Sequence, residues 1–126
     1  SEYRDALLAF AENEIALGER MEDGSTVRSN LESLERQGSP QDQLIPVECP
    51  DEIKYLWEWY WELAERRGSN GYGPNPISYE DVTHWSFWTH SYPDPFEVDC
   101  IMSIDRIYLG SVSEKLKTNG NGTKRR

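Results

Sequence analysis

The feature of this sequence that most constrains its fold is a stretch rich in glycine and proline, Gly68 to Ser78. Its three glycines permit positive φ angles, whereas each proline fixes φ and pushes the residue before it toward an extended conformation. No helix can run through such a stretch, so it divides an aromatic segment from two helical patterns after it. We expect a structural loop that sets the direction of the next helix. The residues expected to hold its shape are Gly71, Gly73, Pro74, Asn75, Pro76 and Ser78.

Two helix starts follow the loop. Ser78 has an aspartate three positions later, which is the pattern of a capping box and predicts a helix over 79–90. Asp94 and Glu97 repeat this pattern around a proline and predict a further helix that begins at Pro95. The inward-facing residues expected in the first of these helices are Val82, Trp85 and either Trp88 or Thr89, with Phe87 off that line.

The segment before the loop predicts an aromatic helix. Pro50 and the two acids after it suit a helix start, and two arginines followed by Gly68 suit its end. The expected apolar face consists of Ile53, Leu56, Trp57, Tyr60, Leu63 and Ala64. Three large aromatic residues fall outside that face. Each of them loses roughly 1.5–3 kcal/mol of burial free energy if its side chain stays in water. Either the N-terminal helices or another molecule must therefore cover them. The residues expected to bind a partner are these three, Tyr55, Trp59 and Trp61, together with Tyr72 and Phe87.

The first half of the chain predicts two more helices and a connector. An amphipathic helix is expected over 3–20, ending near Gly18, and a second one over 26–37. Residues 38–50 contain three prolines and little periodicity, which indicates an extended connector. The fold class expected is all-α, a small bundle of four to five helices with the Gly/Pro-rich loop between the third and the fourth. The expected parts are an acidic N-terminal helical segment and connector (1–50), an aromatic helical core (51–112) and a basic flexible tail (113–126).

Charge is uneven along the chain. Residues 1–65 carry 16 acidic and 5 basic residues, whereas residues 110–126 carry 1 acidic and 5 basic residues, within a net charge of −10. Because nucleic-acid phosphates repel an acidic surface, we expect no nucleic-acid binding by the body of the protein. Partners with basic segments are favoured instead.

Several site classes have no support in the sequence. Cys49 and Cys100 are too few and too far apart for a metal site or a disulfide framework, and His84 and His90 are six positions apart, so they do not share a helix face. There is no long apolar run and no secretory leader, so we expect a cytoplasmic protein without membrane contact. We also expect no metal, no cofactor and no catalytic residues, because a nucleophile–base pair and a phosphate loop followed by Lys and Ser/Thr are both missing.

The last predicted helix carries an aspartate, Asp105, in its apolar face. The other members of that face are Val98, Ile101, Met102, Tyr108, Leu109 and Val112. A buried carboxylate is costly unless several donors satisfy it. The candidate donors are backbone N–H groups of the loop, the indole of Trp57 or Trp85, and an arginine such as Arg66. We expect Asp105 to clamp the loop structurally, because a general acid or base would need a companion group and a pocket.

Over roughly residues 55–109, the sequence resembles the tail assembly chaperones of long-tailed bacteriophages. The segments that carry the resemblance are Leu56 to Leu63, Gly71 to Tyr79, Trp85, Pro95 to Val98 and Asp105 to Leu109. In that family a similar Gly/Pro loop lies between an aromatic helix and a helix with an inward tryptophan. The loop is the most specific part of the match.

The resemblance implies a chaperone that works without catalysis in the host cytoplasm. Members of the family bind the long, helical, aggregation-prone tape measure protein, keep it soluble and deliver tail-tube subunits, the major tail protein, to it. Self-association is left open. The alternative is an acidic phage-encoded inhibitor or nucleic-acid mimic that binds a basic protein groove, and strongly salt-sensitive binding to a DNA-binding enzyme would distinguish it.

Overall fold

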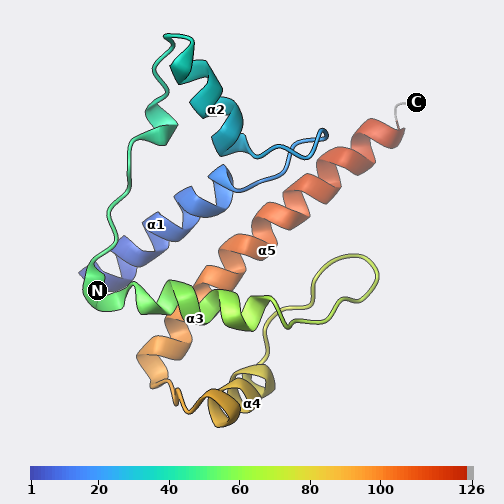
Figure 1. Cartoon of the computed structure of the whole chain (residues 1–126). Helices are drawn as coiled ribbons and strands as arrows, with labels where there is room; N and C mark the ends of the chain where they lie inside the picture. The colour runs from blue at the N-terminus through green and yellow to red at the C-terminus, as the bar shows by residue number, and fades with distance from the viewer. Residues whose placement is uncertain (125–126) are drawn as a thin grey trace.

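The computed structural model describes residues 1–124, and side chains are described for residues 1–118. In this part of the chain there are helices and no strands, so the predicted all-α class is confirmed (Figure 1). The elements in chain order are α1 (Glu2–Leu17), α2 (Val27–Arg36), the 3-10 helices η1 (Asp42–Leu44) and η2 (Asp51–Ile53), α3 (Tyr55–Ala64), α4 (Tyr79–Thr89) and α5 (Pro95–Lys124).

The core lies where α1, α3 and α5 meet. α1 and α5 run side by side in the same direction, and α3 crosses them (Figure 1). Near the start of both long helices, Arg4 Nε donates to Asp99 Oδ2 over 2.7 Å, and near their other ends Lys115 Nζ donates to the backbone oxygen of Arg20 over 2.9 Å. The buried side chains at the centre are Leu7, Ala11 and Ile15 of α1, Leu56, Tyr60 and Leu63 of α3, and Cys100, Ile101 and Ile104 of α5.

Both predicted capping boxes are present. In α4, Asp81 N donates to Ser78 Oγ over 3.0 Å, and Ser78 N donates to Asp81 Oδ2 over 2.9 Å. At the start of α5, the Asp94 and Glu97 side chains accept each other's backbone N–H over 2.8 Å. These interactions span three residues, so they fix the two helix starts without help from the rest of the fold.

The two N-terminal helices have different positions. α1 packs in the core, whereas α2 has no buried residue and projects from the body together with the connector (Figure 1). The expected connector over 38–50 is mostly irregular and contains the single turn η1. α2 therefore contributes little to the buried surface of the fold.

One expectation about a helix face is wrong and another is incomplete. Trp88 and Thr89 are both exposed, and the buried residue one turn after Val82 is Ser86. His90 ends α4 in a left-handed conformation. The chain after it then turns back over Ser86, because Tyr92 N donates to Ser86 Oγ over 3.0 Å. The buried face of α5 also includes Cys100, Ser103 and Ile104, because α1 and α3 cover this helix on two sides.

The basic segment 113–124, expected as a flexible tail, continues α5 as helix. The contact of Lys115 with the backbone of Arg20 supports the first part of this extension. Residues 125 and 126, the end of the expected tail, lie outside the described residues. The division of the chain into parts at 50 and 112 stays a prediction.

Candidate functional site

The Gly/Pro loop folds back on itself before it enters α4. Asn75 N donates to the backbone oxygen of Gly68 over 2.9 Å, and Asn70 N donates to that of Gly73 over 3.2 Å. The Asn70 side chain accepts the backbone N–H groups of Tyr72 and Gly73. Of the three glycines in the loop, Gly71 alone has a positive φ, of 90°. The tip of the loop is therefore held by its own backbone and by one asparagine.

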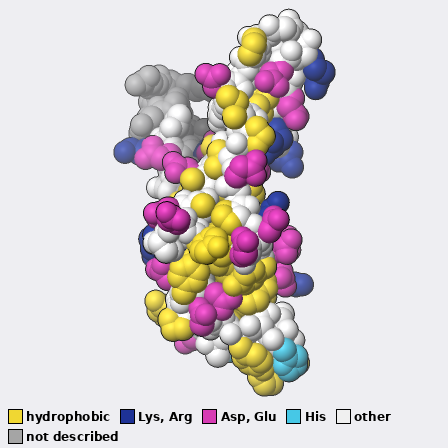
Figure 2. Space-filling view, turned by 90° about the vertical axis from the view of Figure 1, so that its left-hand side faces the viewer, with side chains coloured by type: hydrophobic (Ala, Val, Ile, Leu, Met, Phe, Trp, Pro, Cys, Tyr) yellow, Lys and Arg dark blue, Asp and Glu magenta, His cyan; other side chains and the backbone are white. Residues whose placement is uncertain are grey.

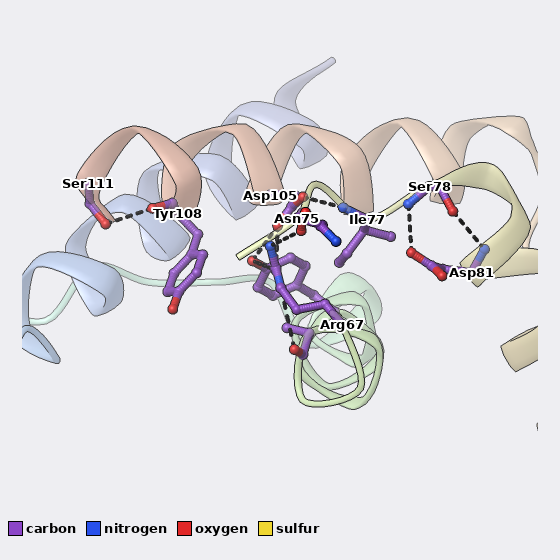
Figure 3. A network of polar contacts seen from close by, with 10 residues as sticks. Arg67, Asn75, Ile77, Ser78, Asp81, Asp105, Tyr108 and Ser111 are labelled. Atoms are coloured by element: carbon purple, nitrogen blue, oxygen red, sulfur yellow. Dashed lines mark hydrogen bonds and ion pairs between the residues drawn. The ribbon is translucent and has the colours of Figure 1, made fainter. Parts of the chain in front are cut away.

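The base of the loop is held by Asp105, which is 3% exposed. Ile77 N donates to its Oδ2 over 2.9 Å, Tyr60 Oη donates to its Oδ1 over 2.8 Å, and Arg67 Nη2 contacts Oδ1 at 2.5 Å (Figure 3). These donors come from the loop, from α3 and from the turn after α3. The carboxylate of α5 thus connects three segments of the chain.

Arg67 completes this arrangement. Its Nη1 donates to the backbone oxygen of Asn75 over 3.2 Å, and its guanidinium lies 5.1 Å from the centre of the Tyr108 ring (Figure 3). Burial, reinforced by the neighbouring Asp105 carboxylate, raises the pKa of Tyr60, so the phenol keeps its proton and acts as a donor. The loop base is therefore a buried ionic network in which both Asp105 oxygens and the Arg67 guanidinium have hydrogen-bond partners.

Two of the three kinds of donor that the sequence suggested for Asp105 are present, a loop N–H group and an arginine, and the third donor is a tyrosine and not an indole. The backbone N–H comes from the loop as expected, but the arginine is Arg67 and not Arg66, which is exposed. The indole Nε1 atom of Trp85 is buried without a hydrogen-bond partner among the described residues, although the side chain as a whole is half-buried. The sequence did contain a signal for the third donor, because a tyrosine on the apolar face of α3, Tyr60, places a phenol in the core that needs an acceptor.

Three of the five aromatic residues expected to bind a partner lie in two separate sets of edge-to-face contacts. The Trp59 ring is 4.9 Å from that of Tyr55 and 5.2 Å from that of Trp85, and the Trp61 ring is 5.8 Å from that of Tyr108. Tyr55 Oη donates to a carboxylate oxygen of Glu97, and burial raises the pKa of Tyr55 to about 12. All three side chains are half-buried by neighbours in the same chain.

The other two expected residues are open to solvent. Tyr72 at the loop tip is 88% exposed, and Phe87 on α4 is 60% exposed. Trp88, one of the two residues between which the sequence left the inward position open, is 79% exposed and lies edge-to-face with Phe87 at 5.2 Å. Because adjacent helix positions point in different directions, the Phe-Trp pair was a signal that at least one of the two faces outward. Figure 2 shows hydrophobic side chains gathered at the level where α3 and α4 lie in Figure 1, with acidic side chains around them.

The sequence segment that contains α4 carries charge of one sign. Residues 79–99 contain five acidic residues and no lysine or arginine. Among the described residues, no group of three or more His, Cys, Asp or Glu side chains is placed to hold a metal ion. None of the helices within residues 1–124 is long and apolar enough to cross a bilayer. The features that gather here are an acidic border and exposed aromatic rings.

A comparison with protein families identifies a match. The model described as phage tail assembly chaperone matches residues 34–110, which is more than half of the chain. The matched region contains α3, the Gly/Pro loop, α4 and the part of α5 that carries Asp105. No curated protein and no solved structure matches the sequence.

Proposed function

The chain belongs to the phage tail assembly chaperone family, and on this premise we propose that it binds the tape measure protein and recruits tail-tube subunits, the major tail protein, during tail assembly in the host cytoplasm. The family match carries this proposal. Exposed aromatic rings on a small all-α domain support it, since aromatic side chains dominate the energetics of many protein interfaces.

The first contact surface in this proposal is formed by α4 and the loop tip. Phe87 and Trp88 present adjacent rings, and Tyr72 stands at the end of the loop. Burying such a ring against a partner yields roughly 1.5–3 kcal/mol, because apolar surface leaves water. Of the residues that the sequence assigned to the same role, Trp59 supports this surface through its contact with Trp85 of α4, and Tyr55 packs on Trp59. Trp61 contacts Tyr108 of α5 instead, away from α4.

The charge of the surface fits a particular kind of partner segment. The acidic residues of 79–99 favour lysine and arginine next to the apolar residues that dock there. They also repel other copies of this acidic chain. The proposed binding mode is therefore apolar anchors on the partner, flanked by basic residues.

The Asp105 network has a structural role in this proposal. Its two carboxylate oxygens accept hydrogen bonds from three donors of the same chain, and that arrangement fixes the angle between α3 and α4. The chain then acts by binding and not by catalysis. Its rigid loop presents the aromatic rings in a fixed geometry.

The test is co-expression with the tape measure protein encoded by the same phage. We expect the soluble fraction of the tape measure protein to rise severalfold when this chain is present, and to fall again with the double variant Phe87→Ala and Trp88→Ala. Leu34→Ala, which removes an exposed apolar side chain from α2, is the matched control and should have no effect. If the tape measure protein is equally soluble without the chain, the proposal is wrong. Binding of the major tail protein to the complex is measured by co-purification.

A further inference from the structure

An apolar stripe with heptad spacing runs along α5, on the side that faces the loop and α4. Its members are Val98, Met102, Asp105, Leu109, Val112 and Leu116. The separations alternate between four and three residues, which is the spacing of the a and d positions in a coiled coil. Leu109, Val112 and Leu116 lie outside the hydrophobic core cluster, and Leu116 is 50% exposed. The second half of the stripe is thus only partly covered by this chain.

Three hollows lie along the stripe. The first, of about 400 Å³, lies between Tyr79, Pro93 and Met102, and the second, of about 360 Å³, lies between Ile77, Met102 and Leu109. The third, of about 210 Å³, lies between Leu109, Leu116 and the loop residues from Tyr72 to Pro74. The first two share Tyr79, Met102 and Arg106 in their lining, and the second and third share Leu109.

We call these three neighbouring hollows, which share lining residues, the α5 groove. From Val98 to Leu116 it follows α5 for roughly 27 Å at 1.5 Å per residue, which is the length of about five turns of a partner helix. Its floor in the middle is Asp105, whose oxygens are occupied by Ile77, Tyr60 and Arg67. Asp105 therefore presents no free carboxylate to an occupant, and the other carboxylate of the groove, Asp99 in the first hollow, pairs with Arg4.

A cation stands in the middle of the groove. Arg106 is exposed, lines the first two hollows and donates from Nη2 to Ser103 Oγ over 2.9 Å. Within the described side chains it forms no ion pair, whereas Arg4, Arg28 and Arg67 each pair with a carboxylate. An unpaired guanidinium beside apolar walls favours a carboxylate on the molecule that fills the groove.

We infer that the α5 groove binds an amphipathic helix of the tape measure protein, with an apolar residue at every third or fourth position and a carboxylate opposite Arg106. This inference rests on the proposed function, because it takes the tape measure protein as the partner. Heptad spacing selects a helix over an extended segment, since only a helix repeats its side chains with this period. A second copy of this chain fits less well, because each copy carries a net charge of −10.

The experiment compares the affinities of two leucine variants for the tape measure protein. Leu116→Glu places a charge in the α5 groove, and Leu34→Glu makes the same change at a similarly exposed position on α2. We expect Leu116→Glu to weaken the affinity for the tape measure protein at least tenfold, and Leu34→Glu to leave it within twofold of the unaltered chain. Circular dichroism and the melting temperature show that both variants are folded.

A charge reversal gives a second readout that does not depend on apolar packing. Arg106→Glu should weaken the complex severalfold, whereas Arg36→Glu, on the exposed side of α2, should not. If the unaltered chain binds the tape measure protein and both groove variants bind equally well, the groove inference is wrong and the proposed function stands. If the unaltered chain does not bind it, both are wrong. A dimer of the unaltered chain that Leu116→Glu dissociates would assign the groove to self-association and overturn the inference.

Discussion

The base and the tip of the Gly/Pro loop are a few residues apart and are held in different ways. At the base, Asp105 accepts the backbone N–H of Ile77 and a buried arginine, and every partner lies in another segment of the chain. At the tip, the hydrogen bonds of Asn70 stay within the loop and Tyr72 is almost fully in solvent. The comparison indicates that the contacts that fix the loop are separate from the surface that we propose for a partner. Changes to the buried side chains at the base should alter stability, and changes to the exposed side chain at the tip should alter binding.

The sharpest test of the comparison is Asp105→Ala. It leaves a buried arginine, a phenol and a backbone N–H without their acceptor, and we expect a loss of about 3–5 kcal/mol in the free energy of unfolding. Urea denaturation measures this loss. The matched control is Asp99→Ala, because Asp99 also pairs with an arginine but is half exposed, and such surface pairs contribute about 0–1 kcal/mol. An unchanged melting temperature for Asp105→Ala would reject the structural role of the network.

Tyr60→Phe tests the contribution of a single hydrogen bond in the network. It removes the phenol that donates to Asp105 and keeps the ring that packs in the core, so we expect a loss of about 1.5–3 kcal/mol, the range for hydrogen bonds to charged groups. Tyr55→Phe removes a similar bond to Glu97 at a half-buried position. Its cost should be clearly smaller, because water replaces the lost partner. Equal losses in urea denaturation would mean that the burial of the network does not determine its contribution.

Gly71→Ala tests the backbone conformation at the tip of the loop, and Gly110→Ala, in α5, is its control. An added Cβ meets no heavy atom within 4 Å at either position, but Gly71 has a φ of +90° and Gly110 lies within α5. Gly71→Ala should cost about 1–2 kcal/mol, because the left-handed region is strained for L-residues. Gly110→Ala should stabilise by up to about 1 kcal/mol, because alanine favours helix. The two melting temperatures should therefore shift in opposite directions. Shifts of the same sign would contradict the left-handed conformation of Gly71 as the reason for the effect.

The parts of the fold that the sequence predicted well depend on interactions between near neighbours. The capping boxes that begin at Ser78 and Asp94 each close within three residues, and the end of α1 at Gly18 follows from one glycine. The all-α class follows in the same way from helical spacing. Local signals of this kind are sufficient when the rest of the fold does not compete with them.

The parts that the sequence could not predict depend on where whole helices end and pack. Asp105 stood out as a carboxylate in an apolar face, but its arginine is Arg67 because α3 ends at Ala64 and the next turn points back toward Tyr108. Trp88 was one of two residues left open for the inward position because helical spacing permits it. The structure leaves it exposed because Val82 and Ser86 already form the contact of this short helix with the core. The partner-binding roles of the five aromatic residues stay predictions.

The smallest effect on stability is expected at the tip, where the comparison predicts the clearest effect on binding. Tyr72→Ala removes a ring that is 88% exposed, so the free energy of unfolding should stay within about 0.5 kcal/mol of the unaltered chain. The affinity for the tape measure protein should fall severalfold, because Tyr72 belongs to the proposed contact surface and also lines the third hollow of the α5 groove. Tyr3→Ala, which removes a half-exposed tyrosine from α1, is the control and should change neither quantity much. A large loss of stability in Tyr72→Ala with normal binding would show that the tip, like the base, serves the fold, and the distinction between the two ends of the loop would be wrong.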